Sequence, residues 1–205
     1  MGDGVLIKGK RFSMRAWADR NIVVGDRVKV IARDPQFGSD FDWQARGGSI
    51  TIGERFRVKS TGKFFSARPE REGEIYMSAA AGDLSLGPGA VLITLGSLEL
   101  RAQDSVTLGD GAKLTVKGDG RKVADLDVVA GDQLAISGAR IKSRRGTYTA
   151  GSSLRISAAI ATPFAQDLHA YQFSATEPGG TCDLRGSRLP VTATITYSCA
   201  TVIPP

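Results

Sequence analysis

The chain has 205 residues and a formal net charge of +6, and 41% of its residues are hydrophobic. This length and composition exclude a disordered chain and are sufficient for a folded core. No apolar run approaches the roughly 18 residues that cross a bilayer, so we expect no membrane span. The excess of basic residues favours loose attraction to anionic surfaces or glycans, but it does not indicate a specific nucleic-acid partner.

Short alternating apolar runs separated by glycine recur along the chain from its first residues. Their common pattern is U-x-U-x-Gly-x-x-U-x-U, in which U is an apolar residue. Alternation with a period of two is typical of strands with one buried face, and glycine permits a sharp corner between them. Because no helical periodicity is sustained between the glycines, the sequence predicts an all-β protein. The copies, in chain order, are VLIKGKRFSM, IVVGDRVKV, ITIGERFRV, LSLGPGAVLI, VTLGDGAKLTV, LDVVAGDQLAI and TYTAGSSLRI.

The spacing of these copies favours a repeat fold. The central glycines of the last four copies differ by 22, 22 and 20 in residue number; they are Gly87, Gly109, Gly131 and Gly151. Paired short strands repeating about every 20 residues are typical of a β-solenoid. We therefore expect about seven stacked coils over residues 1–160, with the central glycines aligned above one another. A β-sandwich also uses short strands at regular spacing and is the alternative fold.

The first interruption of the pattern is RDPQFGSDFDWQARGG, residues 33–48, which predicts an insertion between coils. Binding residues often gather on loops that a rigid scaffold holds. Trp43 could stack on a sugar ring, and Asp40 and Arg46 lie beside it in the sequence, so these three are candidate ligand-binding residues. The alternative is that the aromatic residues cover one end of the core. The acidic residues here lack a complete calcium-loop pattern, and we expect no metal and no cofactor.

The most regular copies lie in residues 82–120, GDLSLGPGAVLITLGSLELRAQDSVTLGDGAKLTVKGDG. This segment resembles the repeats of filamentous-haemagglutinin-type adhesins, and the stacked-strand spikes of phage tails and secretion needles look similar. The resemblance implies a β-solenoid in an adhesin, fibre or tail spike at the cell surface or in a virion. It also implies other protein subunits as partners, in a homotrimer or a filament, and a surface glycan as a further partner.

A small basic cluster interrupts the pattern near residue 143. Lys142, Arg144 and Arg145 lie within IKSRRGT, and clustered basic side chains can bind phosphate or sulfate groups. They are candidate anion-binding residues, although three cations are too few to indicate nucleic-acid binding.

The last segment, residues 161–205, changes character and predicts a small β cap or unit at the end of the solenoid. It contains the only two cysteines, Cys182 and Cys199. A disulfide between them would stabilise a compact cap by roughly 3 kcal/mol and would imply an oxidising, extracellular location. The alternative is a pair of reduced cysteines in a cytoplasmic protein.

No catalytic constellation is visible in the sequence, which lacks P-loop, GxSxG, HExxH and CxxC patterns. The tripeptide RIK at residues 140–142 occurs in polygalacturonases, but the companion motifs of those enzymes are missing. We therefore expect a non-enzymatic structural or adhesive β-solenoid module of an extracellular or virion assembly. The alternatives are a glycan-binding or glycan-degrading β-helix and a self-polymerising scaffold.

Overall fold

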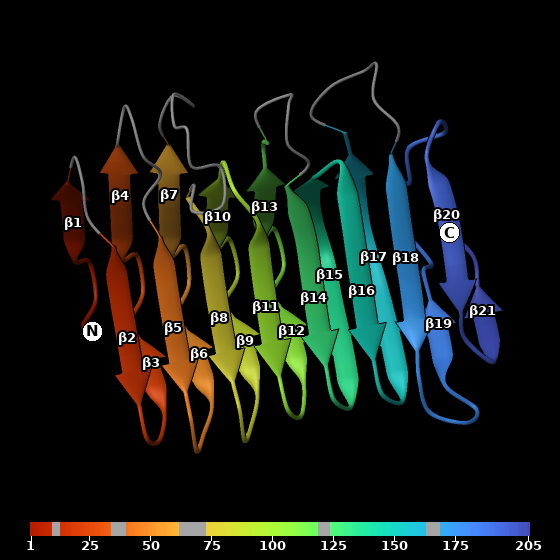
Figure 1. Ribbon diagram of the computed structural model, residues 1–205, viewed down its shortest axis with the longest axis horizontal. Helices are drawn as coiled ribbons and strands as arrows, with labels where there is room; N and C mark the ends of the chain where they lie inside the picture. Colours follow the sequence, from red (N-terminus) through yellow and green to blue (C-terminus); the bar gives the residue numbers. More distant parts are fainter. Residues whose placement is uncertain (10–12, 34–39, 62–72, 119–123, 163–168) are drawn as a thin grey trace.

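The structure is a computed structural model that describes residues 1–9, 13–33, 40–61, 73–118, 124–162 and 169–205. These residues form an all-β protein with two stacked sheets and no helix (Figure 1). None of the described residues belongs to a helix long and apolar enough to span a membrane. The eight-stranded sheet consists of β2 (Met14–Ala18), β5 (Phe41–Ala45), β8 (Ile75–Ala79), β11 (Leu98–Ala102), β14 (Asp125–Ala130), β16 (Arg145–Ala150), β18 (Ala170–Ala175) and β20 (Thr194–Ser198).

The other sheet has 13 strands and two halves that follow each other along the strand direction. The lower half contains β3 (Ile22–Val24), β6 (Ile50–Ile52), β9 (Leu84–Leu86), β12 (Val106–Leu108), β19 (Thr181–Asp183) and β21 (Thr201–Ile203). The upper half contains β1 (Leu6–Gly9), β4 (Lys29–Arg33), β7 (Arg57–Thr61), β10 (Val91–Thr94) and β13 (Lys113–Val116). Two long strands, β15 (Gln133–Lys142) and β17 (Ser153–Ala161), run through both halves.

All strand pairs in the described residues are parallel, and the chain advances by one strand position with each turn. After β5 it crosses into β6 and β7 of the other sheet and returns as β8, which pairs with β5. This parallel, stacked arrangement is compatible with a β-solenoid. It differs from a β-sandwich, in which antiparallel sheets pack face to face.

The core lies between the two sheets and is lined by alternate residues of every strand. In β5 the inward residues Phe41, Trp43 and Ala45 are at most 1% exposed, because successive side chains of a strand point to opposite faces. The buried residues form one cluster along the stack. Each fully buried large apolar side chain contributes about 1.5–3 kcal/mol to the stability of the fold, so this core holds the turns together.

Alanine occupies one inward position at the end of almost every strand of the eight-stranded sheet, where the chain turns into the lower half of the other sheet. A small side chain there lets the two sheets approach each other at the turn. The paired residues of this column are Ala18, Ala45, Ala79, Ala102 and Ala130, followed by Ala150 and Ala175.

Four glycines form a column at the corner between the lower and upper halves: Gly25, Gly53, Gly87 and Gly109. Here consecutive turns approach so closely that a side chain does not fit. A Cβ atom at Gly87 would lie 2.7 Å from the carbonyl carbon of Gly53, and one at Gly109 would lie 2.7 Å from the nitrogen of Pro88. Close approach of the backbone therefore explains the central glycine of these copies.

The expectation that all central glycines align is wrong for Gly9, Gly131 and Gly151. Gly9 is the last residue of β1 and pairs with Ala32. Gly131 and Gly151 lie at the turns that follow β14 and β16, and the Gly131 N–H donates to Ala102 O at 3.0 Å. In these later copies of the pattern, the central glycine therefore lies at a different corner of the turn. In this part of the chain, β15 and β17 run through the corner without a break, apart from a shift of register between Ile136 and Ala139.

The described residues after position 161 continue the same two sheets. β18 and β20 extend the eight-stranded sheet from β16, and β19 and β21 extend the other sheet from β17. Strand pairing therefore shows no boundary near residue 161.

Candidate functional surfaces

Trp43 does not lie on a binding loop. It belongs to β5, is 1% exposed, and its ring centroid lies 5.6 Å from that of Phe56. It fills an inward position of the strand, so its ring is not presented to a ligand. The prediction that Trp43 stacks on a sugar ring is therefore wrong. Of the predicted insertion at residues 33–48, positions 34–39 lie outside the described residues.

Asp40 and Arg46 do not converge on one site. Asp40 directly precedes β5 and Arg46 directly follows it, and six residues of extended strand span roughly 20 Å. An Asp40 carboxylate oxygen accepts the backbone N–H of Glu74 at 3.3 Å, which ties it to the neighbouring strand. The three predicted ligand-binding residues therefore occupy the core and two opposite ends of a strand.

Trp17 is an exposed aromatic residue that was not among the predicted ligand-binding residues. It lies on the outer face of β2 and is 55% exposed. Its Nε1 donates to Asp42 Oδ2 at 3.3 Å, and the guanidinium carbon of Arg46 lies 5.8 Å from its ring centroid. The alternating pattern of MRAWA, in which Trp17 holds a polar-side position, is the signal that could have placed it outside.

Three carboxyl groups gather where β5, β8 and β11 begin. Partial desolvation raises the pKa of Glu74, and the negative charges of Asp40 and Glu99 raise it further. The Glu99 carboxylate is itself paired with Arg101. No observation here points to a ligand for these acidic groups.

The predicted basic cluster separates around a corner. Lys142 is exposed at the end of β15 on the 13-stranded sheet, whereas Arg145 lies on the eight-stranded sheet and pairs with Asp125 at 2.8 Å. Arg144, between them, is only 8% exposed. Adjacent residues of a chain that changes sheets point in different directions, so these three do not form one anion site.

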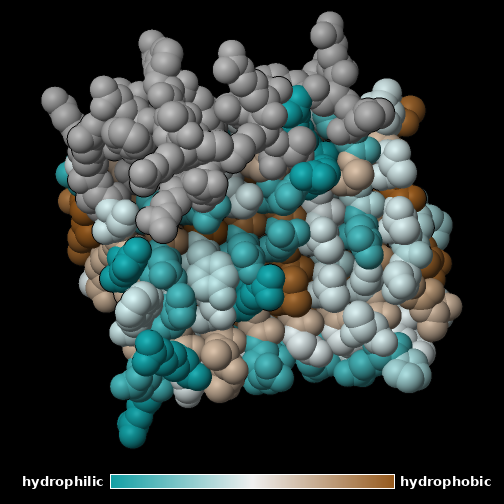
Figure 2. Space-filling model, viewed as in Figure 1, coloured by the Kyte–Doolittle hydropathy of each residue, from teal (hydrophilic) through white to brown (hydrophobic). Residues whose placement is uncertain are grey.

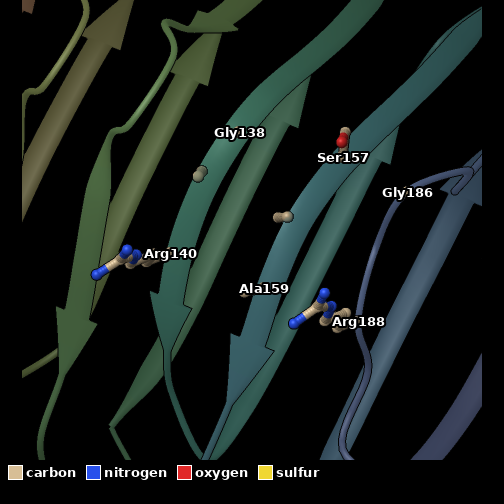
Figure 3. A pocket seen from close by; sticks show the side chains of 8 residues that line it. Gly138, Arg140, Ser157, Ala159, Gly186 and Arg188 are labelled. Carbon is tan, nitrogen blue, oxygen red and sulfur yellow. The ribbon is translucent and has the colours of Figure 1, made fainter.

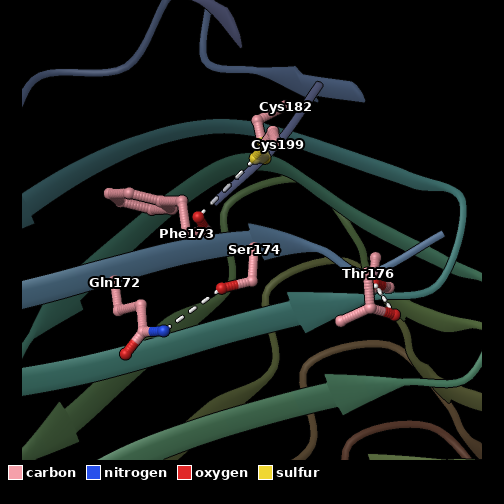
Figure 4. The surroundings of a disulfide bond; sticks show 7 residues. Gln172, Phe173, Ser174, Thr176, Cys182 and Cys199 are labelled. Atoms are coloured by element: carbon pink, nitrogen blue, oxygen red, sulfur yellow. Dashed lines mark hydrogen bonds between the residues drawn. A yellow bond between two sulfur atoms is a disulfide. The ribbon is translucent and has the colours of Figure 1, made fainter. Parts of the chain in front are cut away.

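Cys182 and Cys199 form a disulfide between consecutive turns at the C-terminal end of the stack (Figure 4). Their Cα atoms are 6.0 Å apart, and Cys182 is fully buried in β19. The sulfur of Cys199 lies 3.6 Å from the carbonyl oxygen of Phe173 on β18. The bond therefore links the last strands to the core of the preceding turn.

Both ends of the stack leave core positions partly open in the described residues. At the N-terminal end, inward residues such as Ile7, Met14 and Ile22 are only partly buried against the core. At the C-terminal end, Tyr197 is 38% exposed although its ring stacks on Phe173 with centroids 5.8 Å apart. Val202 of β21 is also exposed. These end faces present apolar groups together with the outer edges of β1, β2, β3, β20 and β21.

Charges of both signs are mixed on the outer face of the eight-stranded sheet. Hydrophilic side chains cover much of this face (Figure 2). Glu99 pairs with Arg101, and Asp125 pairs with Arg145, within or between neighbouring strands. Opposite charges here largely neutralise each other.

The described residues contain no group of three or more His, Cys, Asp or Glu side chains placed to hold a metal ion. His169, the single histidine, is 2% exposed. Comparison with known protein families, curated proteins and solved structures found no match for this chain.

Proposed function

We propose that this chain is a non-enzymatic structural and adhesive module of an extracellular assembly at a cell surface or in a virion. In this proposal, the chain forms a β-solenoid of about seven coils that stack end to end with further coils of the same kind. The observation that carries the proposal is the pair of open end faces, each with unpaired parallel strand edges and half-exposed core residues.

The two end faces match in register. Following the paired residues from strand to strand, Met14 of β2 occupies the same position as Ile195 of β20. In the other sheet, Ile22 of β3 occupies the same position as Val202 of β21. A second copy placed head to tail would bring apolar residues together and would pair both exposed edges. Such a contact is heterologous and builds a filament.

The disulfide supports the extracellular location, because disulfides persist in oxidising compartments. Disulfide mapping on protein from its native source tests this part of the proposal. Reduced Cys182 and Cys199 in a cytoplasmic fraction would overturn the location and would favour an intracellular scaffold. Incubation with neutral and acidic polysaccharides tests the non-enzymatic role, which release of shortened products would overturn.

The stacking itself is tested by blocking one end at a time. We expect I195K/V202K, which places two charges on the C-terminal end, and M14K/I22K, which does so at the N-terminal end, each to abolish filaments in negative-stain images. The matched control T107K/T149K adds two lysines to outward positions in the middle of the stack and leaves filaments intact. Circular dichroism checks that each variant is folded.

Mixing the two blocked variants gives the decisive result. Each retains one open end, so head-to-tail stacking predicts that the mixture sediments as a dimer, while each variant alone sediments as a monomer. A mixture that stays monomeric, or a wild-type protein that forms a closed trimer, overturns end-to-end stacking.

A further inference from the structure

Basic residues line up on the outer face of the upper half of the 13-stranded sheet. One register position can be followed across seven strands and on to Arg188, which pairs with β17 through an isolated bridge. Five of its eight residues are cations; the row contains Leu6, Lys29, Arg57, Val91, Lys113, Arg140, Ala159 and Arg188. The next outward position along the strands contains Lys8, Ile31, Lys59, Ile93, Thr115, Lys142 and Ala161. Neither row contains an acidic residue. We call the basic residues of these two rows the cationic face.

The charges of the cationic face are not neutralised within the described part of the chain. The ion pairs found there join Glu99 to Arg101, Asp125 to Arg145, and Asp183 to Arg185, and all lie elsewhere. Lys29 lies directly beside Arg57, and Lys113 beside Arg140, on neighbouring strands about 4.8 Å apart. Like charges placed opposite each other are destabilising, so an anion bound between them would relieve repulsion.

A shallow groove crosses the same row near its C-terminal end. It has a volume of about 210 Å³ and is lined by Gly138, Ser157, Gly186 and the two arginines Arg140 and Arg188. Ala159 lies between the arginines in the row, and both guanidinium groups extend in the same direction (Figure 3). The small methyl of Ala159 leaves room for an anionic group between the two planar cations, whereas the carboxylate of Asp110 takes the space beside Gly138.

We propose that the cationic face binds an extended anionic polysaccharide, with carboxylate or sulfate groups seated along the row from Lys29 to Arg188. The row is straight and crosses six strand spacings, or roughly 29 Å, which suits a linear polymer better than a single small anion. The uncharged members of the two rows are aliphatic residues and one threonine, whereas surfaces that bind single-stranded nucleic acid stack bases on aromatic side chains. The disulfide favours the extracellular location in which a polysaccharide would be met.

This inference is independent of end-to-end stacking, because the cationic face runs along the side of the stack and is complete in one copy. It also differs from the predicted anion cluster, of which only Lys142 belongs to the face.

Biolayer interferometry tests the proposal, with immobilised heparin as the sulfated polymer, polygalacturonate as the carboxylated polymer, dextran as the neutral polymer, and single- and double-stranded DNA. We expect binding to heparin, polygalacturonate or both, and none to dextran. With five contacts, counterion release predicts an affinity loss of about 100-fold between 50 and 200 mM salt. The sulfated and carboxylated arms distinguish the two anionic groups.

Two pairs of variants locate the site. R57Q/K113Q/R140Q removes three charges from the row and should weaken binding about tenfold at low salt. The control R15Q/R101Q/R145Q removes the same charge from the other sheet and should leave affinity within about threefold. Ala159→Glu should compete with the ligand between the two arginines, whereas Ala135→Glu, on the lower half of the same sheet, should not.

Equal losses in each variant and its control would overturn the proposal, because nonspecific attraction depends on net charge alone. Tighter binding to DNA than to either polysaccharide would overturn it in favour of a nucleic-acid partner. Failure of all polymers to bind at 50 mM salt would also overturn it, and would leave the stacking proposal untouched.

Discussion

Trp17 and Arg46 come from neighbouring turns and face each other outside the eight-stranded sheet, with the guanidinium carbon 5.8 Å from the indole centroid. An exposed cation–π contact of this kind contributes about 0.5–1 kcal/mol. The other tryptophan, Trp43, is buried one register position away, on the opposite side of the same sheet. The two indoles therefore report on two different environments.

This difference predicts opposite results for two tryptophan variants. Trp17→Phe leaves only the buried indole, so fluorescence should shift to shorter wavelength and resist acrylamide quenching. Trp43→Phe leaves the exposed indole, which should be quenched readily. Trp43→Ala should cost about 3–5 kcal/mol of unfolding free energy. Trp17→Ala should cost about 1 kcal/mol or less, and equal costs would contradict the placement of Trp43 in the core.

The glycine column makes a second prediction. Gly109→Ala places a methyl group 2.7 Å from the nitrogen of Pro88, so neighbouring turns must move apart. We expect a loss of at least about 2 kcal/mol in chemical denaturation. Gly2→Ala is the control, since nothing lies within 4 Å of the added atom and stability should be unchanged. A neutral Gly109→Ala would mean that this corner is less closely stacked.

The disulfide makes a third prediction, which concerns the C-terminal turns. Its loop spans a sequence separation of 17, and removing it with C182S/C199S should cost roughly 3 kcal/mol. Hydrogen exchange should accelerate first in β20 and β21, which form the outermost strands at this end. Uniform acceleration over both sheets would show instead that the stack unfolds as one unit.

A fourth prediction concerns Asp183 in β19. Hydrogen bonds from the side chain and backbone of Arg185, with smaller contributions from the charges of Arg185 and Arg155, lower the pKa of Asp183 to about 2. Because the folded-state pKa is depressed, this contact stabilises the protein at neutral pH, and the contribution is lost as pH falls from about 4 towards 2.

Carboxyl NMR titration measures this effect directly. Arg185→Gln should raise the pKa of Asp183 towards 3.8, whereas Arg155→Gln should change it much less. If Arg155→Gln gave the larger shift, long-range charge rather than the hydrogen bonds would set the pKa.

The sequence was sufficient to predict an all-β chain with paired short strands, because alternation fixes which face of a strand is buried. It misplaced Gly131 and Gly151 because the same local pattern, two strands around a glycine, occurs at two different corners of a turn. Trp43 was misassigned because Asp-Pro and Phe-Gly signals before it suggested a loop that extended over a regular strand. The cationic face could not be predicted from the sequence, since the basic residues of each row are more than 20 positions apart and meet only through register.

The unequal lengths of the turns have a consequence for engineering. Paired residues of consecutive turns are 34 positions apart in the sequence for Phe41 and Ile75, but only 20 positions apart for Asp125 and Arg145. The extra residues follow a strand in the upper half of the 13-stranded sheet and precede the next strand of the eight-stranded sheet. An example is the segment between Thr61, where β7 ends, and Ile75, where β8 begins. Foreign peptides grafted at that edge should leave the protein folded, while the same grafts between Ala102 and Val106 would disrupt the tight turn on the opposite edge. The molecule is thus suited to display inserted sequences along a single side.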